Sequence, residues 1–463
     1  MDQQRIRERL YQKYIEPTKR KRKDYIGIEI EIPIVNLQKE AVDYEIVHQV
    51  TDCFLHRFGF IPVGIDDEGN IHSAQNKENG DILSYDCSYN NLEFSLGKGA
   101  ELFSLYNRFS GYYTYIKKEF EKYHYTLTGM GVNPYRSYNH RIPIPNGRYR
   151  MLFHHLESYK KYEHLPIYFH KYPDYGLFSS ASQVQLDIDY EDLMLTLDVF
   201  SKIEPIKALL FSNSILLGEQ EDLLCCRDMF WENSTHGINP HNIGMMECQL
   251  ETMDDLLAYI ESTSIYCVER GDKYINFEPI RITEYFKQES VLGEYYDKES
   301  EIYKEIKVYP DIDDINYLRT FKFEDLTFRG TIEFRSVCCQ PIKDCMTVAA
   351  FHLGLKDQLD ELNDILKKDY SIYHLGYTAT ELRKMFVKRE IPSFIDQDAL
   401  YHFAGKVLDL SWRGLVKRGY GEESFLMPLY ERLENRTNPG KQLLELLEQG
   451  ESLEDMILAY GKL

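Results

Sequence analysis

The chain has 463 residues, of which 43% are hydrophobic and 28% are charged, a composition typical of a globular protein with a large core. Lysine and arginine total 54 against 75 aspartate and glutamate residues, so the formal net charge is −21. This balance argues against nucleic acid as the main ligand. No stretch approaches the roughly 20 apolar residues of a membrane span, so we expect no membrane partner.

The N-terminal residues 1–16 have the charged pattern of a short amphipathic helix that ends at Pro17. They lack the apolar core of a signal peptide, so we expect a cytoplasmic protein. The run KRKRK at 19–23 follows. It is interpreted as a solvated basic run, with a localisation or anion site as the alternative.

The nine cysteines lack a CxxC pair and the spacing of a zinc site or a disulfide framework. The adjacent pairs Cys225-Cys226 and Cys338-Cys339 are expected to be poorly placed to bridge to one another. Reduced thiols are the interpretation that follows, in agreement with a cytoplasmic location.

Residues 25–35, YIGIEIEIPIV, carry the clearest strand pattern in the sequence. Glu29 and Glu31 alternate with a row of isoleucines, so one face is apolar and the other is acidic. Two carboxylates on one face of a strand repel each other, and such a pair either lies in water or shares a cation. Three later stretches with polar faces favour the shared cation.

A helix is predicted at 44–58 and a strand at 61–65. Two short strands follow at 82–85 and 91–96, and Glu93 lies on the polar face of the second. Asp86 precedes Glu93 by an odd interval, which would put the two on opposite faces of one unbroken strand. The turn formers between them would bring Asp86 back to the same site: Ser88, Asn90 and Asn91.

Residues 99–125 are predicted to form a long helix whose aromatic residues face the core. A loop rich in glycine and proline is predicted at 129–150, and a helix at 151–165. In the strand predicted at 177–190, Gln183 and Gln185 share the polar face, where two amides need partners.

Helices are predicted at 190–217 and 252–270, on either side of a loop at 232–244 that contains His236 and His241. These histidines are not part of an HExxH metal-binding motif and are interpreted as loop or core residues.

Residues 286–314 are acidic and rich in tyrosine, with little periodicity. They are interpreted either as an excursion that closes over a site or as an exposed insertion. The last predicted strand, GTIEFRSV at 330–337, puts Glu333 and Arg335 on one face, and from 347 the pattern is helical.

Together these elements predict an α+β protein. Strands far apart in the sequence favour a mainly antiparallel sheet, followed by a helical C-terminal part. We divide the chain into an N-terminal helix at 1–20, a catalytic domain at 21–345 and helices at 346–463 that pack on that domain.

Four predicted strands each place carboxylate or amide groups on one face: Glu29 and Glu31, Glu93, Gln183 and Gln185, and Glu333. Mg²⁺ prefers oxygen ligands, and several acids around one ion would leave net negative charge. We therefore predict two or three Mg²⁺ ions, with Mn²⁺ as a substitute, that carry a polyphosphate. Arg335 is placed to contact a phosphoryl or carboxylate oxygen. The alternative is an acidic face that is merely solvated.

The sequence contains no G-x-x-x-x-G-K-[ST] motif, which excludes a P-loop. It also contains no G-x-S-x-G nucleophile elbow.

Several segments between about residues 25 and 345 resemble the glutamate–cysteine ligases, and within them the plant-type branch. GIEIE at 27–31 is similar to the family's Gly-x-Glu-x-Glu strand, with Ile30 where that branch has histidine. NNLEFS at 90–95 resembles Gly-Gln-Phe-Glu-Leu-Ser, and Asp86 matches an aspartate of the bacterial branch. GMGVNP at 129–134 and PNGRY at 145–149 resemble two further segments.

The resemblance continues along the chain. SASQVQLD at 180–187 is similar to the family strand that supplies metal and nucleotide contacts. FSNSILLG at 211–218 and CRDMFW at 226–231 resemble the Ala-Asn-Ser and Arg-x-x-x-Trp segments, and TIEFRS at 331–336 matches a Glu-x-Arg pair. His236 stands where the family has an arginine, and Tyr317 stands where it usually has a histidine.

The resemblance implies a glutamine synthetase-like fold, in which a curved sheet forms a metal and ATP funnel. It also implies a reaction of glutathione biosynthesis. Mg-ATP phosphorylates the γ-carboxylate of glutamate, and the amine of cysteine attacks the acyl phosphate to give γ-glutamylcysteine, ADP and phosphate.

The residue roles it implies fall into three groups. The metal ligands are Glu29, Glu31, Asp86, Glu93, Gln183 and Glu333, and the ATP contacts are Gln185, Arg329 and Arg335. The substrate contacts are Arg227, Arg148, Trp231 and His236, and Trp231 and the tyrosines at 285–296 shield the acyl phosphate. Arg335, Glu31 and Glu333 are the predicted catalytic residues, in a monomer or homodimer.

Three alternatives stay open. His236 and Tyr317 leave room for a carboxylate–amine ligase with a different amine acceptor. A ligand-binding protein that has lost turnover is the second. The third is a metal-dependent phosphoesterase, although its usual histidine ligands are missing.

Overall fold

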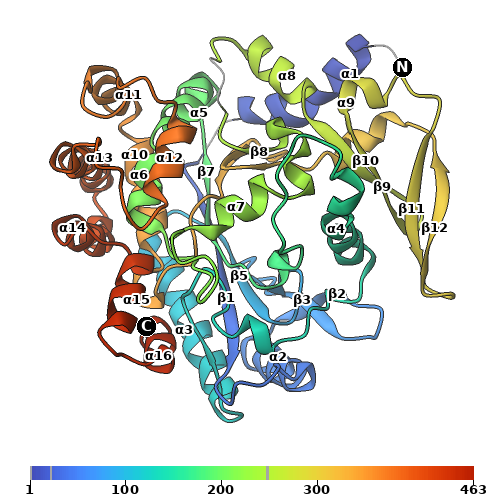
Figure 1. Ribbon diagram of the computed structural model, residues 1–463, viewed down its shortest axis with the longest axis horizontal. Helices are drawn as coiled ribbons and strands as arrows, with labels where there is room; N and C mark the ends of the chain where they lie inside the picture. Colours follow the sequence, from blue (N-terminus) through green and yellow to red (C-terminus); the bar gives the residue numbers. More distant parts are fainter. Residues whose placement is uncertain (1–2, 21–22, 247–249) are drawn as a thin grey trace.

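The computed structural model describes residues 3–20, 23–246 and 250–463, and its centre is an antiparallel sheet built around β1 (Ile26–Asn36) (Figure 1). The strands run in the order β14-β15-β7-β1-β5-β4-β3-β2, and β6 also pairs with β1. The other strands are β2 (Ile61–Ile65), β3 (Ile71–Gln75), β4 (Ile82–Tyr85), β5 (Asn91–Gly99), β6 (Tyr125–Leu127), β7 (Ser182–Asp187), β14 (Glu324–Leu326) and β15 (Thr331–Phe334).

The alternation of β1 separates an apolar face from an acidic face, as the sequence predicts. Ile28, Ile30 and Ile32 are buried in the main core, while Glu29 and Glu31 point to the opposite face. The helices α3 (Leu102–Glu121) and α10 (Thr347–Lys356) pack against this part of the sheet. The core therefore holds one face of the sheet rigid and leaves the other face available for a site.

A second antiparallel sheet has the order β12-β11-β10-β9 and lies across the molecule from the C-terminal helices (Figure 1). Its strands are β9 (Ser264–Arg270), β10 (Lys273–Arg281), β11 (Val291–Asp297) and β12 (Ile302–Val308). Helix α4 (Gly147–Glu157) packs on β10 and β11.

This second sheet corrects two predictions. The helix predicted at 252–270 ends at Glu261, because the β-branched and aromatic residues from Ser264 on pair as β9. The segment 286–314 contains the hairpin of β11 and β12, whose outer strand is mostly exposed and so lacks an apolar alternation in the sequence.

Other helix boundaries also differ from the prediction. The N-terminal helix α1 spans Gln3–Leu10 and continues as a π-helical turn at Tyr11–Ile15 and a 3₁₀ turn at Glu16–Lys19. The predicted helix 190–217 is divided at Ile203 into α5 (Leu193–Lys202) and α6 (Glu204–Phe211), because Pro205 has no N–H to continue the ladder. The helix predicted to reach 125 ends at Glu121, and Tyr125 begins β6.

The remaining α-helices before α10 are α2 (Tyr44–Phe58), α7 (Cys226–Glu232), α8 (Met253–Glu261) and α9 (Ile282–Tyr285). Two short parallel strands, β8 (Ile243–Gly244) and β13 (Phe321–Lys322), join two loops. The C-terminal helices after α10 are α11 (Leu359–Lys368), α12 (Ala379–Phe386), α13 (Gln397–Arg418), α14 (Met427–Glu434), α15 (Pro439–Glu448) and α16 (Leu453–Tyr460). They lie together on one side of the main sheet (Figure 1).

The α+β class, the antiparallel main sheet and the helical C-terminal part are thus as predicted. The division at 20 and 345 stays a prediction, and buried residues from both sides of position 345 share one core cluster. Among the described helices, none is long and apolar enough to cross a membrane.

Candidate functional site

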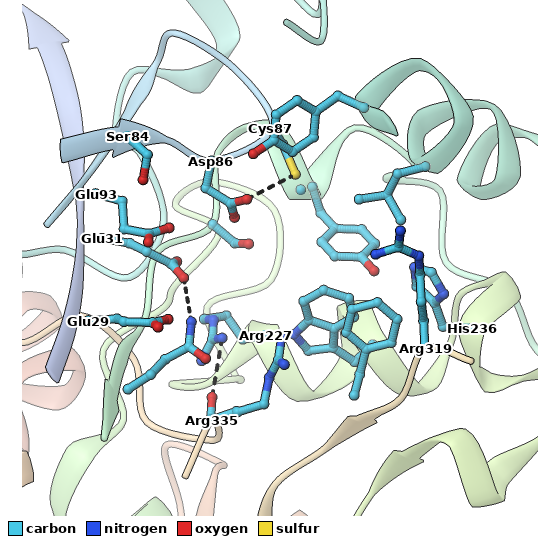
Figure 2. A pocket seen from close by; sticks show the side chains of 18 of the residues that line it. Glu29, Glu31, Ser84, Asp86, Cys87, Glu93, Arg227, His236, Arg319 and Arg335 are labelled. Atoms are coloured by element: carbon cyan, nitrogen blue, oxygen red, sulfur yellow. Dashed lines mark hydrogen bonds between the residues drawn. The ribbon is translucent and has the colours of Figure 1, made fainter. Parts of the chain in front are cut away.

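A cavity of about 450 Å³ opens over the acidic face of the main sheet (Figure 2). Strand register explains why the acids gather there. Glu31 lies opposite Glu93, Glu29 lies opposite Gln183, and Gln185 lies opposite Glu333. Side chains directly opposite one another on neighbouring strands share a face, so four strands contribute to one patch.

Asp86 joins this patch through a turn, as its spacing from Glu93 requires. Cys87 has a positive φ of 59°, and the Asp86 amide donates to the carbonyl of Asn91 at 3.2 Å. The chain therefore reverses between β4 and β5, and Asp86 lines the same cavity as Glu93.

The amides and carboxylates are connected by hydrogen bonds. Gln183 Nε2 donates to Glu31 Oε1 at 2.7 Å, and the backbone N–H of Ala181 donates to Glu31 Oε2 at 2.7 Å. Gln185 Nε2 donates to Glu29 Oε1 at 3.1 Å and to Glu333 Oε1 at 2.8 Å. The two glutamines, which the sequence predicted to need partners, thus bridge neighbouring acids.

The acids disfavour their own ionised forms. Burial, followed by the nearby Asp86 carboxylate, raises the pKa of Glu31 to about 8 and the pKa of Glu93 to about 7. Burial, then Glu333 and Glu93, raises the pKa of Glu29 well above its usual value. A group of buried carboxylates with raised pKa values is the environment in which a bound cation would stabilise the charged forms.

The oxygen donors of this patch are of the type that hard divalent cations prefer. Carboxylate oxygens are joined by Gln183 Oε1, which is buried and has no hydrogen-bond partner within the described residues. In the part of the chain that the structure describes, no three His, Cys, Asp or Glu side chains are grouped so as to hold a metal ion. Glu29 and Glu31 instead hydrogen-bond the two glutamines, so the predicted Mg²⁺ sites stay a proposal.

Arginines face the acids across the cavity. Arg335 Nη1 lies 3.0 Å from Glu333 Oε2 and 4.0 Å from Asp325 Oδ2. Arg227, on α7, is buried and donates from Nη1 to the carbonyls of Ser336 and Val337, each at 3.2 Å. Arg148, at the start of α4, also lines the cavity. The cavity can therefore bind anions and cations side by side.

Arg319 lines the same cavity, and sequence reasoning did not find it. It lies near His236, on the side opposite the acids (Figure 2). Its Nε is buried without a hydrogen-bond partner among the described residues. Tyr317, which stands where the resembled family usually has a histidine, does not line the cavity. Its hydroxyl donates a hydrogen bond to Glu269 Oε2 at 3.2 Å. Arg319 lies just before β13, whose Phe321 also lines the cavity. This closeness in the sequence to a residue of the cavity wall is the feature that could have indicated Arg319.

The wall beside Arg319 is aromatic. Trp231 stacks on Phe321 with ring centroids 4.4 Å apart, and the centroid of the His236 ring lies 4.2 Å from that of Phe321. Burial, followed by the nearby His155 and Arg319, lowers the pKa of His236 well below its usual value, so the ring is neutral. Both of its ring nitrogens lack a partner among the described residues.

The predicted site residues are largely brought together. The cavity is lined by Glu29, Glu31, Asp86, Glu93, Arg148, Gln183, Arg227, Trp231, His236, Glu333 and Arg335. Gln185 and Arg329 line an adjoining cavity of about 440 Å³ that also touches Glu29, and Arg329 donates to Gln185 Oε1 at 2.7 Å.

The expectation that the tyrosines at 285–296 shield this cavity is wrong, and of the two interpretations of 286–314 the structure favours the exposed insertion. Tyr285 is fully buried and donates to Asp314 at 2.7 Å, so it does not shield this cavity. Nor do Tyr295 and Tyr296 of β11 line it, and the described hairpin of β11 and β12 lies outside the lining.

The cysteine pairs, expected to be poorly placed to bridge, in fact meet. Cys225 Sγ lies 3.5 Å from Cys338 Sγ, although both are free thiols. Ser214 connects them, because it pairs with Cys225 in an isolated bridge and its hydroxyl accepts a hydrogen bond from Cys338 Sγ at 3.3 Å, which the sequence spacing did not indicate.

This combination of an acidic and amide sheet face with opposing arginines lines a cavity that suits small charged molecules. No family model matches the chain. Its curated relatives are glutamate–cysteine ligases, which confirms the resemblance seen in the motifs.

The chloroplastic enzyme of Solanum lycopersicum is 24% identical over 316 residues, which is 66% of this chain and 54% of the relative. The chloroplastic enzyme of Arabidopsis thaliana is 25% identical over 342 residues, or 70% of this chain and 59% of the relative. The chain thus spans less than two thirds of the length of these relatives. A crystal structure of glutamate–cysteine ligase from Francisella tularensis in complex with AMP aligns over 96% of this chain and 89% of that one, with 12% identity and a TM-score of 0.48.

Proposed function

We propose that the protein is an ATP- and Mg²⁺-dependent glutamate–cysteine ligase. The γ-carboxylate of glutamate attacks the γ-phosphorus of ATP to give an acyl phosphate and ADP. The amine of cysteine then attacks the acyl carbon, loses a proton and displaces phosphate, giving γ-glutamylcysteine. The observation that carries the proposal is the strand register that sets Glu31 against Glu93, and Gln185 against Glu333, beneath a cluster of arginines.

The chain's own residues would divide this work. Glu29, Glu31, Asp86, Glu93, Gln183 and Glu333 are the proposed ligands of Mg²⁺, which when bound supplies positive charge to the phosphates. Arg335 and Arg329 would offset the charge of the transferring phosphoryl group, which needs positioning more than covalent help. Arg227 and Arg148 would hold an amino-acid carboxylate, and the stacked rings of Trp231 and Phe321 would exclude water from the acyl phosphate.

The test is ADP release by the purified protein with Mg²⁺, ATP and glutamate, with and without cysteine, together with the mass of the product. Release that depends on cysteine and yields γ-glutamylcysteine supports the proposal. Absence of any glutamate-dependent ADP release contradicts it and leaves the binding-protein interpretation.

One observation favours a related ligase with a different amine acceptor. His236, which stands where the resembled family has an arginine, lines the cavity as a neutral ring whose two nitrogens have no partner among the described residues, so the contact it would offer an acceptor differs from that of the family. Glutamate-dependent ADP release that ignores cysteine but responds to another amine would select this alternative. A cytoplasmic location and a monomeric or homodimeric state stay predictions.

We expect His236 to act on the acceptor and not on glutamate or ATP. Replacing it by alanine removes a hydrogen-bonding ring from the wall of the cavity, and should raise KM for the acceptor by roughly tenfold, the value of one polar contact. KM values for glutamate and ATP should stay near those of the wild type. Equal changes in all three constants would point to a structural role instead.

A further inference from the structure

The N-terminal segment forms one wall of a further cavity beside the acidic site. This cavity measures about 690 Å³, and its N-terminal wall contains Arg9, Lys13 and Arg20. Its other wall contains Arg319, Arg329 and Arg335, and it shares with the acidic cavity Arg148, Arg319, Phe321, Glu333 and Arg335. The two spaces are therefore neighbouring parts of one cleft.

The lining of this cavity is strongly basic in a protein of net charge −21. Cationic side chains come from both walls, while Asp325 and Glu333 are the carboxylates that line it. Arg20 and Arg329 also line the adjoining cavity of about 440 Å³, together with Lys23 and Lys98. A single carboxylate needs one guanidinium, so cations on opposite walls indicate a ligand with several negative charges.

The segment is held firmly in this position. Ile6 and Leu10 are buried, and Arg7 forms ion pairs with Glu261 at 2.8 Å and with Asp254 at 3.0 Å. These contacts tie α1 to α8, on which it packs. Helix α1 thus fixes the residues that follow it over the cleft.

Lys13 is anchored inside the cleft by its own hydrogen bond. Its Nζ donates to the carbonyl of Ile315 at 2.6 Å, which uses one of three ammonium donors. Burial lowers the pKa of Lys13 to about 8, against the opposing effect of Asp325. A bound anion would compensate for the lost hydration of this ammonium group.

Aromatic side chains complete the cavity. Tyr14 and Phe321 line it, and Phe328, which is 62% exposed, lies at the same cavity beside Arg329. Flat rings beside a row of cations suit a ligand that combines a heteroaromatic base with a phosphate chain.

We propose that the N-terminal segment is part of the binding site for the polyphosphate chain of a nucleoside triphosphate, with Lys13 and Arg20 as phosphate contacts. The inference rests on the proposed function, because it concerns the nucleotide of that reaction. It assigns a ligand contact to the basic run at 19–23, of which residues 21–22 lie outside the described residues.

The experiment measures binding of Mg-ATP and of tripolyphosphate by calorimetry in the full chain, without turnover. Lys13→Met and Arg20→Met should each weaken Mg-ATP binding by roughly tenfold, and the double variant by more, because each removes a charge-assisted contact. Arg20→Lys keeps the charge and should retain most of the affinity. Arg5→Met is the matched control, since Arg5 is exposed on α1 and lines neither cavity.

Glutamate binding should be unchanged in all variants, which separates a phosphate contact from a general loss of structure. Mg-ATP affinity in the double variant equal to that of the wild type would overturn the inference, even if the protein is a ligase. A wild type that binds Mg-ATP in a Lys13- and Arg20-dependent way but makes no γ-glutamyl product would support the inference and reject the proposed function. A wild type that binds neither Mg-ATP nor tripolyphosphate would reject both.

Discussion

At the scale of single residues, Glu31 is a buried carboxylate of the acidic face that is held by two donors. It accepts hydrogen bonds from Gln183 Nε2 and from the Ala181 N–H, and it is 6% exposed. A cation bound beside this carboxylate would favour its ionised form and displace to solvent the proton that the raised pKa of about 8 retains. Its chemistry therefore depends on its charge more than on its shape.

Glu31→Gln keeps the shape and removes that charge. We expect ADP release to fall by more than about 100-fold, because even the loss of a residue that only orients a metal ligand costs about 10- to 100-fold. The variant should stay folded by circular dichroism. Glu40→Gln, at an exposed position, is the control and should match the wild type. Wild-type activity in Glu31→Gln would reject the metal assignment.

At the scale of secondary-structure elements, the close crossing of α10 and α13 depends on two glycines. A Cβ at Gly414 would lie 1.9 Å from the carbonyl oxygen of Gly354, nearer than any two such atoms can approach. The backbones can touch only because neither residue has a side chain. This crossing joins the helix that covers the main sheet to the longest C-terminal helix.

Gly414→Ala should therefore lower the free energy of unfolding by about 1–3 kcal/mol, the usual cost of overpacking. Gly405→Ala in the same helix is a sharp control, since a Cβ there has nothing within 4 Å. That change should instead stabilise the protein by up to about 1 kcal/mol through helix propensity. Urea unfolding measures both, and equal effects of the two substitutions would contradict the argument.

The sequence pattern predicted an element well where one of its faces is buried and the other is not, and poorly where most of the element is exposed. The strands of the main sheet were found because one residue in two is apolar, as in β1. The hairpin of β11 and β12 was missed because β12 is mostly exposed and has no apolar alternation. The helix predicted at 190–217 is two helices in the structure, because Pro205 interrupts the backbone hydrogen bonds at Ile203.

At the scale of the whole molecule, a buried ion network ties the C-terminal helices to the site. Arg383 on α12 donates to both oxygens of Asp228, at 2.7 and 3.0 Å, and to Glu204 Oε2 at 2.6 Å. Asp228 lines the acidic cavity next to Arg227. Lys207 also pairs with Glu204, and Ser336 donates to it at 3.0 Å. The C-terminal part therefore positions α7 and its arginine.

Arg383→Met should destabilise the protein by about 3–5 kcal/mol, because it leaves two buried carboxylates short of a partner. The neighbouring Lys384→Met should cost at most about 1 kcal/mol, since Lys384 is exposed in its ion pair with Glu232. Denaturant unfolding of both variants tests this. A similar loss from the two substitutions would show that the network contributes little.

The same network predicts a response to acid. Burial opposes the charge of Glu204, but Lys207 and Arg383 outweigh it and lower its pKa from 4.5 to about 2. Because the pKa in the folded state is depressed, the stabilisation is complete above about pH 4.5 and is lost as the pH falls from there toward 2. The loss of unfolding free energy over this interval should be smaller in Arg383→Met than in the wild type. Identical losses would exclude the network as the cause.

Patterns in the sequence were enough to predict the α+β class, the polar faces of the strands and most of the acids and arginines that line the cavity. They were enough because alternation with a period of two assigns each side chain of a strand to a face, whatever that strand pairs with. Similarity to a known family then indicated which polar faces belong together.

Tertiary structure decided what depends on contacts between distant segments. The register that sets Glu31 against Glu93, the place of Arg319 in the cavity and the meeting of Cys225 with Cys338 follow from pairing and packing. The basic wall of the neighbouring cavity also follows from packing, because Lys13 and Arg20 lie hundreds of positions from Arg319 and Arg335 in the sequence. Local patterns carry no information about such neighbours, because the free energy that joins them comes from burying surface across the whole chain.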